Sequence, residues 1–223
     1  MYYWRKNNYE GLLEVASSLE DETELHLYAQ YCRLRENGLR KQALSQLKEF
    51  IEIAELWNIN QRYEFVDRLY WIKENNSEIY DLIPHPLHVA IVEPTIAEWI
   101  EENPTDPSGY RWLGGIEGWR KAISLDSAEQ ISRVRLIKII IYNAHYATHH
   151  LPECFIGKPA EELMGLNEAI VLLDGLTNQE QKAEFREKIK DCRELISAYQ
   201  DYQNSTYVGT FESWAELYDR RCC

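Results

Sequence analysis

His145 and His149 have the spacing that most closely resembles a metal-binding pattern. Two imidazoles four residues apart lie on one face of a helix and can bind one zinc ion, and Cys154 follows closely enough to be a third ligand. In the H-E-x-x-H pattern of zinc hydrolases a glutamate after the first histidine is the general base, and here that position is Tyr146. His145 also continues the apolar stripe of its helix, which favours the alternative of buried, hydrogen-bonded histidines.

Other catalytic motifs are absent from the sequence. There is no G-x-S-x-G turn and no C-x-x-C pair. The glycine-rich segment 114–118 lacks the Gly-Lys-Ser/Thr of a phosphate-binding loop and contains Glu117, which would repel phosphate. Adjacent glutamates such as Glu161 and Glu162 are typical of a solvated helix face. We therefore expect no catalytic residue and no cofactor.

The distribution of charge is more informative than any motif. The chain has 24 Lys and Arg against 37 Asp and Glu, a net charge of −13, which argues against nucleic acid or an anionic membrane as partner. The segment 74–110 contains no Lys or Arg, whereas it contains acidic residues and aromatic residues. A clustered negative field speeds the capture of a basic protein, and Trp and Tyr are frequent at the centres of interfaces.

The segment 74–110 and the residues just after it therefore supply candidate partner-binding residues. They are Glu93, Glu98, Trp99, Glu101, Glu102, Asp106, Tyr110 and Trp112. The alternative is that these aromatic residues pack in the core and that the acidic residues only keep the protein soluble.

Helical periodicity dominates the chain and predicts an all-α protein of about nine helices, stacked as antiparallel hairpins or as an irregular bundle. In the first hairpin, Asp21 and Thr23 supply capping oxygens, and Gly38 is the expected left-handed residue that ends the first helix. Signals for β-strands are nearly absent.

The longest helix is expected over residues 127–150 and is apolar nearly all round, which indicates a central position. Ser127 and Gln130 have the spacing of a capping box at its start, and Thr177 and Glu180 have the same spacing at the start of a later helix.

The segment 103–107 is the best candidate for a linker. It separates N-terminal helical hairpins (1–103) from C-terminal hairpins (104–223) that surround the long helix. We expect the two parts to form one continuous domain.

Two fragments of the chain resemble the tetratricopeptide repeat, a helix–turn–helix unit of about 34 residues. The positions that agree with its pattern are Leu27, Gly38, Ala43 and Leu47 in the first hairpin, and Tyr110, Leu113 and Gly114 later. The chain departs from the pattern at Tyr31, where the repeat has a small residue, and at Phe50, where it has alanine. The resemblance implies stacked helical hairpins and a protein- or peptide-binding scaffold without catalytic chemistry.

The cellular compartment is inferred from two features. The basic pair Arg5-Lys6 has no apolar run behind it, and the five cysteines are scattered along the chain, so we expect a cytoplasmic protein. The longest apolar stretch, 136–142, is far shorter than the ~20 residues that span a bilayer.

Three functional hypotheses follow. The leading one is a non-enzymatic protein–protein interaction module whose acidic, aromatic surface binds a basic protein, for example an immunity or antitoxin protein that covers the active site of a basic toxin. The second is a metal-dependent α-helical hydrolase that uses His145 and His149. The third is a repeat scaffold that binds a peptide in a concave groove.

Overall fold

The computed structural model describes residues 11–19, 21–76 and 78–222, and these residues form helices and turns without any β-strand. The expected all-α class is therefore confirmed for this part of the chain. The expectations about the segment before residue 11 and about Cys223 lie outside the described residues. Within the described part, no helix has both the length and the apolar character that a membrane crossing requires.

The chain divides into two compact units, Met1–Leu113 and Gly114–Cys223, each of which is described by itself. The boundary lies ten residues after the expected one at 103/104, because the turn after residue 102 joins two helices that pack against each other within the first unit. The expectation of one continuous domain stays a prediction.

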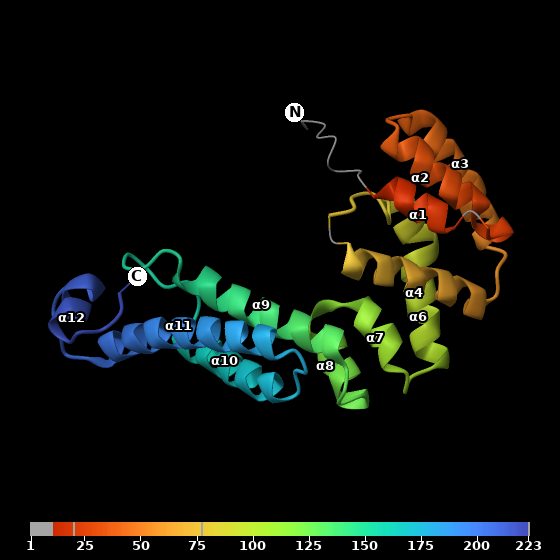
Figure 1. The fold of residues 1–223 in the computed structure, drawn as a ribbon. Coiled ribbons are helices and arrows are strands. Elements are labelled where there is room, and N and C mark those ends of the chain that lie inside the picture. The colour runs from red at the N-terminus through yellow and green to blue at the C-terminus, as the bar shows by residue number, and fades with distance from the viewer. Residues whose placement is uncertain (1–10, 20, 77, 223) are drawn as a thin grey trace. The chain divides into compact units, whose positions relative to one another are not determined.

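The helices of unit 1 (Figure 1) are α1 (Leu12–Ser18), the 3-10 turn η2 (Thr23–Leu25), α2 (His26–Glu36), α3 (Arg40–Ala54), α4 (Ile59–Asn75), α5 (His85–Leu87), the π-helical segment η3 (His88–Val92), α6 (Glu93–Glu102) and α7 (Pro107–Leu113). Those of unit 2 are α8 (Gly115–Leu125), α9 (Gln130–Thr148), α10 (Pro159–Asp174), α11 (Gln179–Asn204) and α12 (Phe211–Leu217). Several of these helices are short, and the count of about nine is not confirmed.

The core of unit 1 is aromatic. Tyr28 on α2 packs with ring centroids 5.4 Å from Phe50 on α3 and 5.3 Å from Phe65 on α4. Trp57, in the turn between α3 and α4, lies edge-on to Phe50 and Phe65. Rings of this size bury a large apolar area and prefer tilted or edge-on contacts, so this cluster holds α2, α3 and α4 together.

Three side chains of α2 hold the segment between α4 and α5. The hydroxyl of Tyr28 donates to the carbonyl oxygen of Leu82 at 2.5 Å, and the hydroxyl of Tyr31 donates to that of Asp81 at 2.7 Å. Arg35 forms an ion pair with the Asp81 carboxylate at 2.5 Å. Residues at positions i, i+3 and i+7 share one face of a helix, which is why all three reach the same segment. We call these contacts the α2 clamp.

Gly38, the residue after the C-cap Asn37 of α2, has a φ of +77°, as the sequence predicts, and a left-handed residue costs little at glycine. The thiol of Cys32 on α2 is buried, and burial raises its pKa to about 12.

Unit 2 is built on three long helices, α9, α10 and α11, which lie side by side (Figure 1). Their core contains Ile137 and Ala144 of α9, Leu166 of α10, and Ile189 and Ile196 of α11.

Unit 2 also contains a buried thiol, as unit 1 does with Cys32. Burial raises the pKa of Cys192 to about 11.

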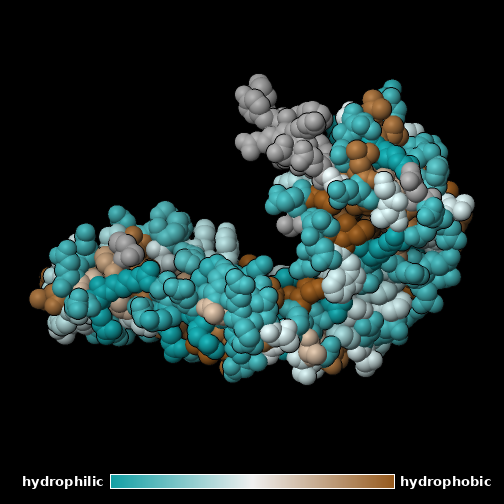
Figure 2. Space-filling view, viewed as in Figure 1, coloured by the Kyte–Doolittle hydropathy of each residue, from teal (hydrophilic) through white to brown (hydrophobic). Residues whose placement is uncertain are grey.

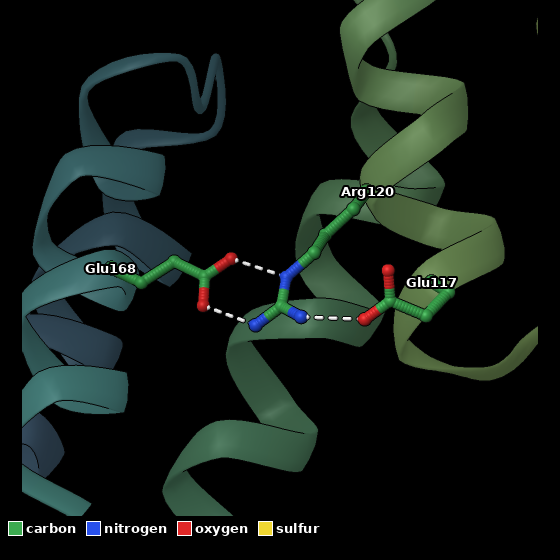
Figure 3. A network of polar contacts seen from close by, with 3 residues as sticks. All are labelled: Glu117, Arg120 and Glu168. Atoms are coloured by element: carbon green, nitrogen blue, oxygen red, sulfur yellow. Dashed lines mark hydrogen bonds and ion pairs between the residues drawn. The ribbon is translucent and has the colours of Figure 1, made fainter. Parts of the chain in front are cut away.

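A surface contact of unit 2 links α8 to α10. Arg120 donates to both carboxylate oxygens of Glu168, at 2.8 and 2.6 Å, and to Glu117 at 2.7 Å (Figure 3). The hydrogen bonds to Glu168, followed by those to Glu117, raise the pKa of Arg120.

Arg133 is the buried cation of unit 2. Its guanidinium donates to the carbonyl oxygens of Ser127 at 2.7 Å and Leu172 at 3.2 Å, and it lies against Gly175, at the end of α10. A buried charge requires such hydrogen bonds because the loss of water is otherwise very costly. The arginine thereby joins the start of α9 to the end of α10.

Neither predicted capping box forms, and the N-cap of each helix lies one or two residues after the predicted one. The N-cap of α9 is Glu129, which accepts from the backbone N–H of Ser132, and the N-cap of α11 is Asn178, which accepts from that of Gln181. Gln130, expected in the first box, instead uses its Oε1 to accept from the backbone N–H of Thr177 at 3.0 Å and from its hydroxyl at 3.1 Å. A tertiary contact thus replaces the local one.

Substitution of Gly175 by alanine tests the role of Arg133. An added Cβ would lie 2.3 Å from Cζ of Arg133, so we expect Gly175→Ala to lower the free energy of unfolding by about 1–3 kcal/mol, as overpacking does. In the control Gly165→Ala, the new methyl group meets only Ile140 at an ordinary 3.5 Å. Because alanine is the better helix former, this variant should gain about 0.5–1 kcal/mol. Urea denaturation of both variants measures the difference, and equal effects would contradict this role.

The α2 clamp predicts the effect of a single hydroxyl. Tyr31→Phe should lower the free energy of unfolding of unit 1 by about 1 kcal/mol, because it leaves the Asp81 carbonyl without its donor. Tyr80→Phe is the matched control, since this exposed ring lies in the same segment and its change should be near zero. Thermal unfolding followed by circular dichroism gives both values, and a Tyr31→Phe variant as stable as the control would refute the clamp.

Candidate functional site

The predicted acidic residues of α6 are mostly exposed. Glu93, Glu101 and Glu102 are open to solvent, whereas Glu98 is half-buried and forms an ion pair with Arg62 of α4 at 2.7 Å. The three exposed carboxylates are accessible to a partner, and their role in binding stays a prediction.

Trp99 and Asp106 have structural partners within unit 1. The Trp99 indole stacks on Tyr63 at 3.8 Å, and its N–H donates to Asp106 at 2.8 Å. Asp106 also accepts from the backbone N–H of Ser108 at 2.9 Å and from its hydroxyl at 2.6 Å. Burial alone would raise the pKa of Asp106, but the hydrogen bonds from Ser108 and Trp99 outweigh it and lower the pKa below its ordinary value.

Trp112 lies in the interior, which differs from its expected place on a docking surface. It is 3% exposed, its ring stacks on Tyr70 at 5.0 Å, and its N–H donates to Asp67 at 2.6 Å. Tyr110 is half-buried, and its hydroxyl donates to the carbonyl oxygen of Pro104 at 3.3 Å. Since α6 and α7 fold against α4, the aromatic rings that follow the acidic segment pack mainly inside the unit.

His145 and His149 are both exposed, so the expectation that His145 points to the core is wrong. Eight residues separate it from the buried Ile137, and at about 100° per residue it lies about 80° away from that side chain around the helix. Nδ1 of His149 is 2.6 Å from the carbonyl oxygen of Tyr146. Within the described residues, no three His, Cys, Asp or Glu side chains are arranged to hold a metal ion.

A cavity of about 460 Å³ in unit 1 combines acidic and aromatic groups. It lies between η2 and α4, and its lining includes the buried Leu25 and Phe65 together with the half-buried Trp57. Glu24 of η2 and Glu64 of α4 also line it. We call this the acidic cavity.

The charges of the acidic cavity do not cancel. Arg68 pairs with Glu22 and donates to the carbonyl oxygen of Ser18 at 3.2 Å, so its charge is already partnered. Glu24 and Glu64 are exposed and form no ion pair with any other described residue. A cation is attracted both by such carboxylates and by the face of an indole. The cavity therefore has the chemistry to bind a Lys or Arg side chain along Trp57.

The sequence did contain a signal for this site. Residues 20–24 include four acidic residues among five, which is the densest acidic run in unit 1. In the sequence this run indicates only the start of a helix, because nothing in it shows that Trp57 and Glu64 fold back beside it.

Hydrophobic side chains are also exposed elsewhere, among them Leu56, Met164 and Val171. Figure 2 shows that the visible surface of each unit is mostly hydrophilic, with hydrophobic residues in small, separate patches.

Comparisons of the chain with protein-family models, with curated proteins and with solved structures found no match. The functional proposal therefore depends on the geometry and charge of the site.

The lowered pKa of Asp106 predicts a pH dependence of stability. A carboxyl group whose pKa is lower in the folded state stabilises the fold above its unfolded pKa, and this contribution is lost as the pH falls through the folded pKa. We expect wild type to be more stable than Asp106→Asn above about pH 5, with the difference shrinking below about pH 4. Urea denaturation across this pH range measures it, and a difference independent of pH would contradict the assignment.

Proposed function

We propose that the chain is a cytoplasmic, non-enzymatic protein–protein interaction module that binds a basic segment of a partner protein in the acidic cavity. The observation that supports this is that Glu24 and Glu64, beside the half-buried ring of Trp57, form no ion pair with any residue that the structure describes. A partner's Lys or Arg would gain both a charge partner and an aromatic contact there.

The charge of the whole unit favours a basic partner. Residues 1–113 contain 20 Asp and Glu against 11 Lys and Arg, a net charge of −9. A field of this sign accelerates the encounter with a basic protein and disfavours acidic ones. The exposed Glu93, Glu101 and Glu102 of α6 contribute to this field.

A specific version of this proposal is an immunity or antitoxin protein that covers the active site of a basic, nuclease-type toxin. Such an inhibitor needs strong negative charge and no catalytic group of its own. This version predicts that a reading frame for a basic toxin lies next to the gene, and that the purified chain inhibits that toxin at a one-to-one ratio. A neighbouring toxin whose activity the chain leaves unchanged would refute it.

The acidic cavity can be tested with defined peptides. The full chain is titrated with an arginine-rich peptide by calorimetry at low and at physiological salt. We expect saturable binding that salt weakens, and Glu24→Gln/Glu64→Gln should raise the Kd about tenfold, because each lost charge contact is worth up to about 1 kcal/mol. Trp57→Leu should also weaken binding.

The matched control is Glu101→Gln/Glu102→Gln, which removes the same charge from α6 of the same unit. A much smaller effect of this control would place binding at the acidic cavity. Equal losses in the two double variants would show that only net charge matters, and an absence of binding would refute the proposal.

A further inference from the structure

A second, chemically opposite groove lies in unit 2, between α10 and α11. It has a volume of about 360 Å³, and its apolar lining consists of Ile170 and Leu173 of α10 and Ile189 of α11. One carboxylate, that of the largely exposed Asp174, also lines it and lies 3.8 Å from Lys182. Leu173 and Ile189 are buried, whereas Ile170 is 39% exposed and accessible from solvent. The groove therefore has an apolar floor that a ligand can reach.

Three cations of α11 line the same groove. Arg186, Lys190 and Arg193 are at positions i, i+4 and i+7, so they lie on one face and extend over about 10 Å along the helix. Arg186 and Arg193 form no ion pair with any described residue. The contact of Lys190 with Glu194 is long, at 3.7 Å, and both side chains are largely exposed, so it neutralises little.

The positive surface continues beyond the groove. A neighbouring pocket of about 480 Å³ shares Lys190 and Arg193, and Arg220 and Arg221 line it together with the acidic Glu194 and Asp219. Arg220 pairs with Asp201 at 3.0 Å and Arg221 with Asp191 at 2.8 Å, so their charges are balanced locally. The uncompensated positive charge thus belongs to the row of three on α11, in a chain whose net charge is −13.

We propose that this groove, the basic groove, binds an acidic amphipathic helix of a partner protein. Apolar side chains on one face of such a helix would cover Ile170 and the floor, and carboxylates on its flank would meet Arg186, Lys190 and Arg193. Apolar grooves bind amphipathic helices in this way, with apolar residues of the bound helix at i, i+3, i+4 and i+7 as the anchors. The negative charge of the rest of the chain opposes the approach of nucleic acid or an anionic membrane, which presents negative charge over a wide area.

The experiment uses the full chain and a labelled synthetic peptide that forms a helix with leucines on one face and glutamates beside them. Fluorescence anisotropy should show saturable binding that salt weakens. Arg186→Gln/Lys190→Gln/Arg193→Gln should raise the Kd at least about tenfold, as expected for three rim contacts. Ile170→Asp should also weaken binding, because it places a charged carboxylate in the apolar floor of the groove.

The control variant, Arg40→Gln/Lys41→Gln/Lys48→Gln, removes three exposed cations from α3 of unit 1 and should bind as the wild type does. The same peptide with glutamine for glutamate should bind weakly. Glu24→Gln/Glu64→Gln should keep full affinity, which separates the basic groove from the acidic cavity. Circular dichroism confirms that each variant is folded.

Three outcomes would overturn the proposal. The first is an absence of saturable binding, and the second is equal affinity of the wild type and the triple α11 variant. The third is that phosphatidylglycerol vesicles or a DNA duplex bind through the same three cations whereas the peptide does not.

Discussion

The hydrogen bonds and the ion pair that the α2 clamp makes with residues 81 and 82 are the contacts on which unit 1 depends. They hold the segment that leads from α4 to α5 against α2, and Tyr28 at the same time packs on Phe65 of α4. Phe65 lines the acidic cavity, so the clamp, the aromatic core and the proposed site form one continuous structure. The position where the tetratricopeptide pattern has a small residue is occupied by Tyr31, whose hydroxyl makes one of these bonds.

In unit 2 a buried cation, Arg133, holds two helix ends together. Arg133 joins the start of α9 to the end of α10 by hydrogen bonds to two carbonyl oxygens, and Gly175 leaves space for its guanidinium. Gln130, three residues earlier, bonds Thr177 in the turn that follows α10. Because these contacts fix one end of α10 against α9, the groove between α10 and α11 lies in a well-braced part of the unit. The two units thus carry the two proposed sites, which have opposite charge, on separately stabilised frames.

The all-α class and the turn at Gly38 could be predicted from the sequence, since periodicity and glycine chemistry are local signals. The expectation that the longest helix spans 127–150 is wrong, because α9 has 19 residues whereas α11 has 26. The helix caps were predicted one or two residues too early, because Gln130 and Thr177 bond each other across the fold and not within their own helices. The burial of Trp112 could not be predicted either, because its partners Tyr70 and Asp67 lie more than forty residues away in the sequence. The acidic run at residues 20–24 can be recognised in the sequence, but only the tertiary structure shows that Trp57 lies beside it.

The buried thiols have a practical consequence. Cys32 lies in the core of unit 1 and Cys192 in the core of unit 2, and burial keeps the pKa of both far above neutrality. A protonated, enclosed sulfur reacts slowly with alkylating reagents until its surroundings open. The chain therefore carries one internal reporter in each half, and the modification rates of the two cysteines would reveal separately how often each half opens in the native protein.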